Sequence, residues 1–222
     1  MLIDVADFQQ KNYSNVIRYV SILSGGKMKN KILFTLVILA VLTAGCATTG
    51  KEVPLTDFNR VEIQDGFHVD IIVGKEYSVT PNVDDDVLRK IEVVRQGDTL
   101  IFRAKPSQGI IPGSLIAEVT MPSLTALSLG SGSHVNVNGS GDELTLKASA
   151  GSHADLSDFK VENAVVKASS ASHVTVNVSG KLDASASGGS HIFYLGDPYI
   201  KTSNVSSGSI IQKHWGLYLE LD

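Results

Sequence analysis

Apolar and polar residues alternate along much of the chain after about residue 56. In Val61–Ile63 and Phe67–Ile71 every second side chain is apolar, and polar residues fill most of the places between. This period of two is typical of strands that bury one face. Gln96-Gly97-Asp98 separates two further runs and predicts a hairpin. Asp84-Asp85-Asp86 precedes an apolar pair and predicts the start of a helical turn, where carboxylates favour the helix dipole.

From residue 131 onward, a short segment of small residues recurs at nearly constant intervals. The fourth residue of each segment follows the previous one by 19, 20, 18 and 19 positions. A period near 20 indicates a stack of structural repeats. The segments are Ser131-Gly132-Ser133-His134, Ala150-Gly151-Ser152-His153, Ser170-Ala171-Ser172-His173, Gly188-Gly189-Ser190-His191 and Ser207-Gly208-Ser209-Ile210.

The residues around these segments repeat as well. Apolar side chains recur at the first and third positions after each segment's fourth residue, and also at the fifth and seventh positions before it. The last repeat departs from the pattern at Ser203 and Lys213, as expected of a terminal repeat. The four sets are Val135, Ala154, Val174, Ile192 and Ile211; Val137, Leu156, Val176, Tyr194 and Lys213; Leu129, Ala148, Ala168, Ala186 and Val205; and Leu127, Leu146, Val166, Ala184 and Ser203.

The pattern predicts an all-β fold that ends in a β-solenoid with coils of about 19 residues. Stacked coils about 4.8 Å apart would share one apolar interior and pair every backbone. An N-terminal region of strands and a hairpin would precede the coils. An antiparallel meander is the competing interpretation, and equal spacing with in-phase apolar positions favours the solenoid. The corner serines, expected to form a hydrogen-bonded ladder, are Ser133, Ser152, Ser172, Ser190 and Ser209.

Four histidines are expected to share one outward edge of the stack: His134, His153, His173 and His191. Imidazoles on adjacent coils could bind Zn²⁺, Cu²⁺ or Ni²⁺. Alternatively, they form a polar ladder that seals the corner, each ring bonded to serine or backbone. No other cofactor is expected. Serine recurs in all five segments and histidine in four of them, whereas a catalytic site is normally single, so the sequence indicates that the protein is not an enzyme.

The chain has 222 residues and a formal net charge of −4, and it contains no basic run. Nucleic acid is therefore not an expected partner. The only cysteine of the sequence, Cys46, excludes an internal disulfide.

The residues before Cys46 resemble a bacterial lipoprotein signal. Lys27, Lys29 and Lys31 precede the 13 apolar residues Ile32–Ala44. Such a run is short for a membrane span and fits the core of a signal peptide. Leu42-Thr43-Ala44-Gly45-Cys46 resembles the lipobox, although the large apolar residue stands four places before the cysteine instead of three. A short membrane anchor with an incidental cysteine is the alternative.

These features predict an order of segments along the chain. Residues 1–45 would be the signal peptide, with Met28 as the hypothetical true start, and residues 46–55 a lipidated tether. Residues 56–212 would form the β-solenoid domain, and residues 213–222 a capping strand. The protein would be attached to the cell envelope by its lipid, and Ala47 after the cysteine favours the outer membrane.

The mature part resembles the head GIN domain family of auto-transporter adhesins. The resemblance covers about residues 56–212. It implies a right-handed parallel β-helix and transfers no catalytic residue. The chain departs from the family pattern by placing histidine where the family often has aspartate. The matching residues are Phe58, Arg60-Val61, Gly66-Phe67-His68-Val69-Asp70-Ile71, Gly74, Tyr77-Ser78-Val79, Leu100-Ile101-Phe102 and Met121-Pro122-Ser123-Leu124.

Two classes of function are consistent with these observations. The first is a non-catalytic adhesion or binding module that offers flat faces to an unknown protein or glycan. The second is a structural lipoprotein that self-assembles into homo-oligomers through its terminal repeats. A metal-binding lipoprotein that uses the four histidines is a third, weaker option.

Overall fold

The computed structural model describes residues 52–106, 109, 111 and 113–214. The predicted signal peptide, Cys46, most of the tether and residues 215–222 lie outside this range. None of the helices in the described residues is both long and apolar enough to cross a membrane.

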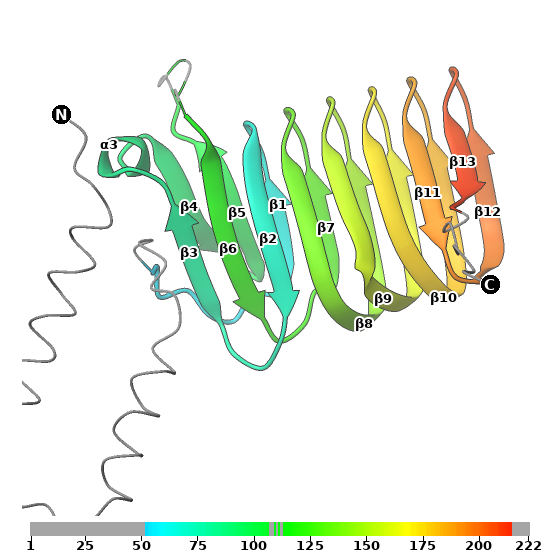
Figure 1. Ribbon diagram of the computed structural model, residues 1–222, viewed down its shortest axis with the longest axis horizontal. Coiled ribbons are helices and arrows are strands. Elements are labelled where there is room, and N and C mark those ends of the chain that lie inside the picture. The colour runs from blue at the N-terminus through cyan, green and yellow to red at the C-terminus, as the bar shows by residue number, and fades with distance from the viewer. Residues whose placement is uncertain (1–51, 107–108, 110, 112, 215–222) are drawn as a thin grey trace, which may run out of the picture. The chain divides into compact units, whose positions relative to one another are not determined.

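The described residues form an all-β protein with one sheet of 13 strands, most of them parallel (Figure 1). The strands are β1 (Arg60–Ile63), β2 (Phe67–Val73), β3 (Ser78–Asn82), β4 (Ile91–Gln96), β5 (Thr99–Ala104), β6 (Leu115–Met121), β7 (Ala126–Leu129), β8 (His134–Ala148), β9 (His153–Ala168), β10 (His173–Ala186), β11 (His191–Leu195), β12 (Tyr199–Val205) and β13 (Ile210–Lys213). One helical turn, α3 (Asp85–Leu88), follows Asp84 as predicted.

Successive repeats lie side by side in parallel and in register. The equivalent residues Leu127 and Leu146 face each other across β7 and β8, and Leu146 faces Val166 across β8 and β9. The long strand β8 pairs its first half with β2 and its second half with β7. An antiparallel meander over these residues is therefore wrong.

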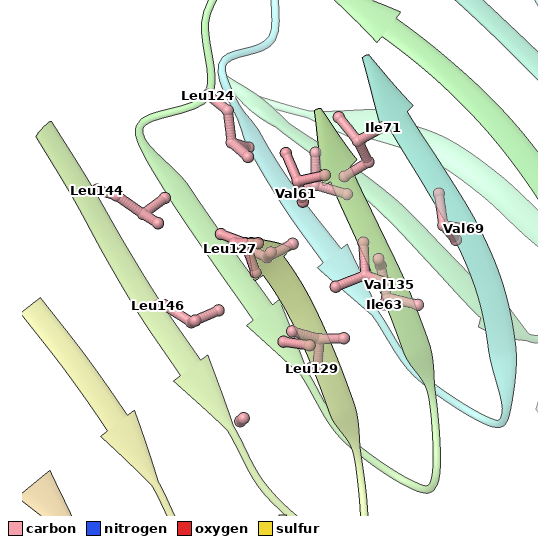
Figure 2. Packing of buried hydrophobic residues seen from close by; sticks show 14 of the residues in the cluster. Val61, Ile63, Val69, Ile71, Leu124, Leu127, Leu129, Val135, Leu144 and Leu146 are labelled. Atoms are coloured by element: carbon pink, nitrogen blue, oxygen red, sulfur yellow. The ribbon is translucent and has the colours of Figure 1, made fainter. Parts of the chain in front are cut away.

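Alternate side chains of the strands meet in one continuous apolar core. Figure 2 shows Val61 and Leu127 turned toward Val69 and Val135, which come from the other arm of the repeats. Leu146 is fully buried. Complete burial of a leucine side chain stabilises the fold by about 1.5–3 kcal/mol. The sequence pattern of apolar positions thus identifies the inward-facing residues.

The N-terminal strands β1 and β2 continue the stack of the later repeats, a continuity that the sequence analysis did not predict. β1 pairs in parallel with β7, and β2 pairs in parallel with β8. Antiparallel pairing is limited to β3 with β6 and to the predicted hairpin of β4 and β5. The insertion of β3 to β6 between two repeats hid this continuity, because it breaks the interval of about 19 residues.

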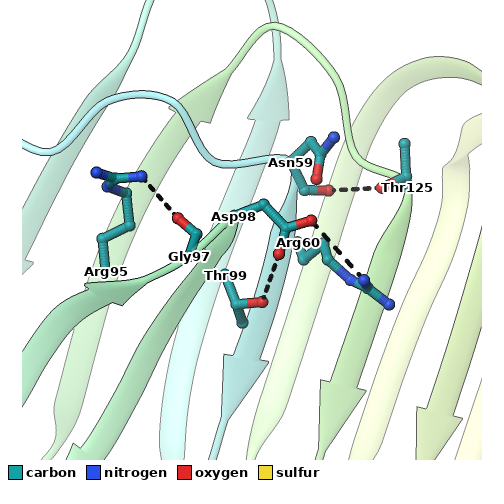
Figure 3. A network of polar contacts seen from close by, with 7 residues as sticks. All are labelled: Asn59, Arg60, Arg95, Gly97, Asp98, Thr99 and Thr125. Atoms are coloured by element: carbon teal, nitrogen blue, oxygen red, sulfur yellow. Dashed lines mark hydrogen bonds and ion pairs between the residues drawn. The ribbon is translucent and has the colours of Figure 1, made fainter.

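Polar contacts hold the β4–β5 hairpin against the first repeat (Figure 3). Arg95 donates a hydrogen bond to the Gly97 carbonyl at 2.6 Å, which fastens the hairpin turn. Asp98 lies 3.8 Å from the guanidinium of Arg60 on β1. Because both side chains are about half exposed, this ion pair contributes little stability and mainly orients the turn.

The opposite end of the stack exposes apolar residues. Tyr199 is 71% exposed on β12, and Ile210 is 41% exposed on β13. Residues 213–222 were predicted to cap this end. Lys213 is the last residue of β13, and residues 215–222 lie outside the described range, so the cap stays a prediction.

Each corner turns through two residues with positive φ. Gly151 has a φ of 72°, and Ala171, which stands at the equivalent place in the next repeat, has a φ of 60°. Consecutive positive φ angles are typical of the type I′ turn. Alanine in this conformation is strained by about 1–2 kcal/mol, whereas glycine is not.

We therefore expect Ala171→Gly to stabilise the fold by about 0.5–1 kcal/mol, since relief of strain exceeds the entropy lost by glycine. The matched change Gly151→Ala should destabilise the fold by about 1 kcal/mol. Backbone strain alone would cause this loss, because no atom lies within 4 Å of the added Cβ and a steric clash is therefore excluded. Urea unfolding of the variants measures both effects. Equal stabilities for all three proteins would contradict the assignment of strain.

Candidate functional site

Histidines from five strands form one column on the surface. The backbone register places His68 opposite His134, and each further histidine opposite the next. Consecutive rings stack with centroids 4.4, 5.7, 6.1 and 4.7 Å apart. The structure thus brings together the four histidines singled out in the sequence and adds a fifth. The histidine column consists of His68, His134, His153, His173 and His191.

His68 was missed by the sequence analysis because it precedes the insertion. Its local context nevertheless carries the same signal as the later corners. Asp65 and Gly66 have positive φ, and the buried Val69 follows the histidine. Alignment of corners by their two turn residues, without a fixed interval, would have found it.

Aromatic contacts extend the column beyond His191. Phe193 lies parallel to the His191 ring at 6.3 Å, with an angle of 9° between the planes. His214, the last of the six histidines in the sequence, meets Phe193 edge-on at 6.0 Å. The series of ring contacts therefore continues beyond His191 to Phe193 and His214.

The corner serines are buried directly beneath the column. Ser133, Ser152, Ser172 and Ser190 are 0% exposed, and Ser209 is 8% exposed. Their hydroxyls bond mainly to main-chain groups and not to one another. Ser172 Oγ donates to the Ala148 carbonyl at 3.0 Å and accepts from the Ser169 amide at 3.1 Å. The hydroxyls of Ser133, Ser172 and Ser190 each bond within their own turn and also to a carbonyl of an earlier repeat.

The histidine rings do not bond to these serines in the described residues. Their closest polar contact is with each other, since His191 Nδ1 lies 3.1 Å from His173 Nε2. No group of three or more His, Cys, Asp or Glu residues converges on one point within the described part of the chain. A site with three or more such ligands is thus absent there, and the ring nitrogens that come closest together belong to one histidine pair.

Burial lowers the pKa of His153 below its ordinary value of 6.5, and the positive charges of His134 and His173 lower it further. The carboxylate of Asp155 opposes this shift. Neighbouring imidazoles resist simultaneous protonation because their like charges repel. The ring of His153 therefore favours its neutral form more than a free imidazole does.

A shallow groove lined by both polar and apolar side chains runs beside the column. It has a volume of about 210 Å³ and carries carboxylate, amide and hydroxyl groups. Asn136 donates a hydrogen bond to Asp70 at 2.7 Å, and the Ser157 amide donates to Asp155 at 3.0 Å. These bonds fix the orientation of several polar groups along the wall. The groove is lined by Asp70, Ile71, Ile72, Asn136, Val137, Asn138, Asp155, Ser157 and Asp158.

A family model described as "putative auto-transporter adhesin, head GIN domain" matches residues 57–154 and 131–198. The chain belongs to the head GIN domain family. The two matches overlap at residues 131–154, as expected where neighbouring repeats resemble one another. The family is named for adhesins and not for an enzymatic activity.

Solved structures resemble this GIN domain at low identity. A protein titled as an adhesin from Bacteroides fragilis is 14% identical, with a TM-score of 0.49 over 74% of this chain and 95% of that one. One titled as a lipid binding protein from Parabacteroides distasonis is 15% identical, with a TM-score of 0.32 over 74% and 96%. No curated protein matches the chain.

We expect NMR titration to give His153 a midpoint below 6.5, since burial and two like charges disfavour its proton. His134→Asn should raise this midpoint, and Asp155→Asn should lower it. Because the unfolded chain binds the proton more strongly, His153 should destabilise the fold progressively as pH falls below 6.5. A midpoint that neither substitution moves would contradict the coupling.

Proposed function

We propose that this GIN domain is the non-catalytic binding module of an envelope-anchored lipoprotein. The observation that carries the proposal is the ordered polar groove on one flat side of the stack. Parallel repeats present the same type of side chain at regular intervals, which suits an extended ligand. The periodic recurrence of serine and histidine also favours a structural role for these residues over a catalytic one.

We also propose that the stack is a right-handed parallel β-helix. Pairing between residues about 19 positions apart, in parallel and in register, supports a continuous wind of the chain. Parallel strands need crossover connections, and these are right-handed in nearly all proteins. Such a wind keeps the groove straight, because each repeat is displaced from the last by one strand spacing.

The polar side chains of the groove suit a glycan ligand. Asp70, Asn136 and Asp155 present carboxylate and amide groups toward solvent from three adjacent strands. These groups donate and accept hydrogen bonds in the manner that a polyhydroxylated ligand requires. Their fixed orientation lowers the entropy lost on binding.

Glycan-array screening of the full chain in detergent should identify a ligand for the groove. Asp155→Asn should weaken its binding roughly tenfold, as expected for loss of one charge-assisted hydrogen bond. Asp142→Asn is the matched control, because Asp142 is exposed and is not among the groove residues.

Two results would overturn this assignment. Equal weakening by both variants would show that overall charge controls binding. The absence of any glycan ligand, together with dimers or larger species in light scattering, would favour the self-assembling lipoprotein instead. The exposed residues Tyr199 and Ile210 at the end of the stack would then be the first candidates for the contact.

We propose that Cys46 carries the lipid that holds this module at the envelope, with the outer membrane as its destination. The support comes from the sequence alone: a short apolar run, preceding lysines and small residues before the cysteine. One acyl chain anchors a protein only marginally, so durable attachment requires more than one.

Metabolic labelling with an alkyne analogue of palmitate should mark the wild-type protein. Cys46→Ser should abolish the label, because the thiol is the attachment point. Thr48→Ser, a conservative change two residues away, should retain it. An unlabelled wild-type protein, or a labelled Cys46→Ser variant, would refute lipidation at this residue.

A further inference from the structure

The fold does not require histidine in the column. Ile210 occupies the equivalent position in the last repeat and pairs in register with His191. The corner therefore accepts an exposed apolar side chain at this place. Nevertheless, five of the six histidines in the sequence occupy this one column. Their accumulation indicates a use for imidazole chemistry that backbone geometry does not explain.

One pair in the column differs from the others. His173 Nε2 and His191 Nδ1 lie 3.1 Å apart, and within the described residues no other neighbouring pair of the column has ring nitrogens at hydrogen-bond distance. The ring centroids of the pair are 4.7 Å apart, with 25° between the planes. Phe193, two residues further along the same strand, lies parallel to the His191 ring at 6.3 Å.

The separation of these nitrogens fits two ligands of a single metal ion. Two bonds of about 2.0–2.1 Å whose ends lie 3.1 Å apart subtend roughly 100° at the ion. This angle lies between the right angle of tetragonal coordination and the tetrahedral angle. Metal binding would replace the direct contact between the two nitrogens, and the rings, which solvent reaches, would rotate to direct both lone pairs to the ion.

We propose that His173 and His191 form a surface site for a divalent transition metal, with Cu²⁺ bound most tightly and water completing the coordination. Imidazole nitrogens suit copper, nickel and zinc, and copper has the highest affinity in the first-row series. No third side chain converges on the pair among the described residues. The site is thus an open one, in which water positions remain free for an oxygen or nitrogen donor of a ligand.

The site is independent of the proposed glycan groove. The groove is lined by residues of β2, β8 and β9, whereas the pair lies on β10 and β11. A protein that binds no metal would therefore not contradict the proposed glycan binding. A protein that binds no glycan would likewise not contradict the metal site.

The test is titration of the full chain, purified in detergent without a histidine tag, with CuCl₂ in a calorimeter. We expect one tight site per chain, weakened at least tenfold in His173→Asn and in His191→Asn. His68→Asn is the matched control, because His68 lies at the far end of the column, and it should leave the affinity within about twofold.

Copper electron paramagnetic resonance of the wild-type complex gives a readout that does not depend on the folding of variants. We expect superhyperfine coupling to two imidazole nitrogens. Coupling to one nitrogen or none, or no calorimetric heat at millimolar copper, would overturn the proposal. Equal weakening by His68→Asn would also overturn it, because the column as a whole would then bind the metal without selecting this pair.

Discussion

Parallel pairing in register between successive repeats is the constraint on which the rest of the structure depends. A single repeat of about 19 residues cannot bury its apolar face alone, so it is stable only against a neighbour. A slip of one residue would turn every inward side chain outward. Leu127, Leu146 and Val166 are all fully or nearly fully buried, so the apolar interior holds the register from one repeat to the next.

The same register acts on the outer surface. The residue that follows each buried corner position lies about 5 Å from the equivalent residue on the next strand. A histidine there becomes a column, and a carboxylate two residues later, such as Asp70 or Asp155, becomes part of a polar wall. The backbone register thus aligns equivalent surface side chains in rows, and no further folding interaction is needed. This explains how a domain with a uniform core can carry a distinctive outer face.

The sequence predicted most of the inward and outward positions because alternation and repetition are local signals. The apolar sets at Leu127 and at Val135 were assigned correctly, as was the hairpin around Gly97. The parallel pairing of β1 and β2 was not predicted, because strands β3 to β6 intervene and interrupt the period. Contacts across such an insertion depend on the three-dimensional path of the chain, which a fixed interval does not encode.

For the same reason, the histidine column could be predicted only in part. Regular spacing placed His134 to His191 on one edge, but it could not distinguish one pair from another. All neighbouring rings of the column are stacked, and the His173–His191 pair differs because two of its ring nitrogens also lie 3.1 Å apart. This difference arises from side-chain orientation, since the backbone register is the same for both the His173–His191 and the His68–His134 pairs. A periodic backbone therefore need not give a periodic chemistry, because the register places each side chain but does not fix the orientation of its ring.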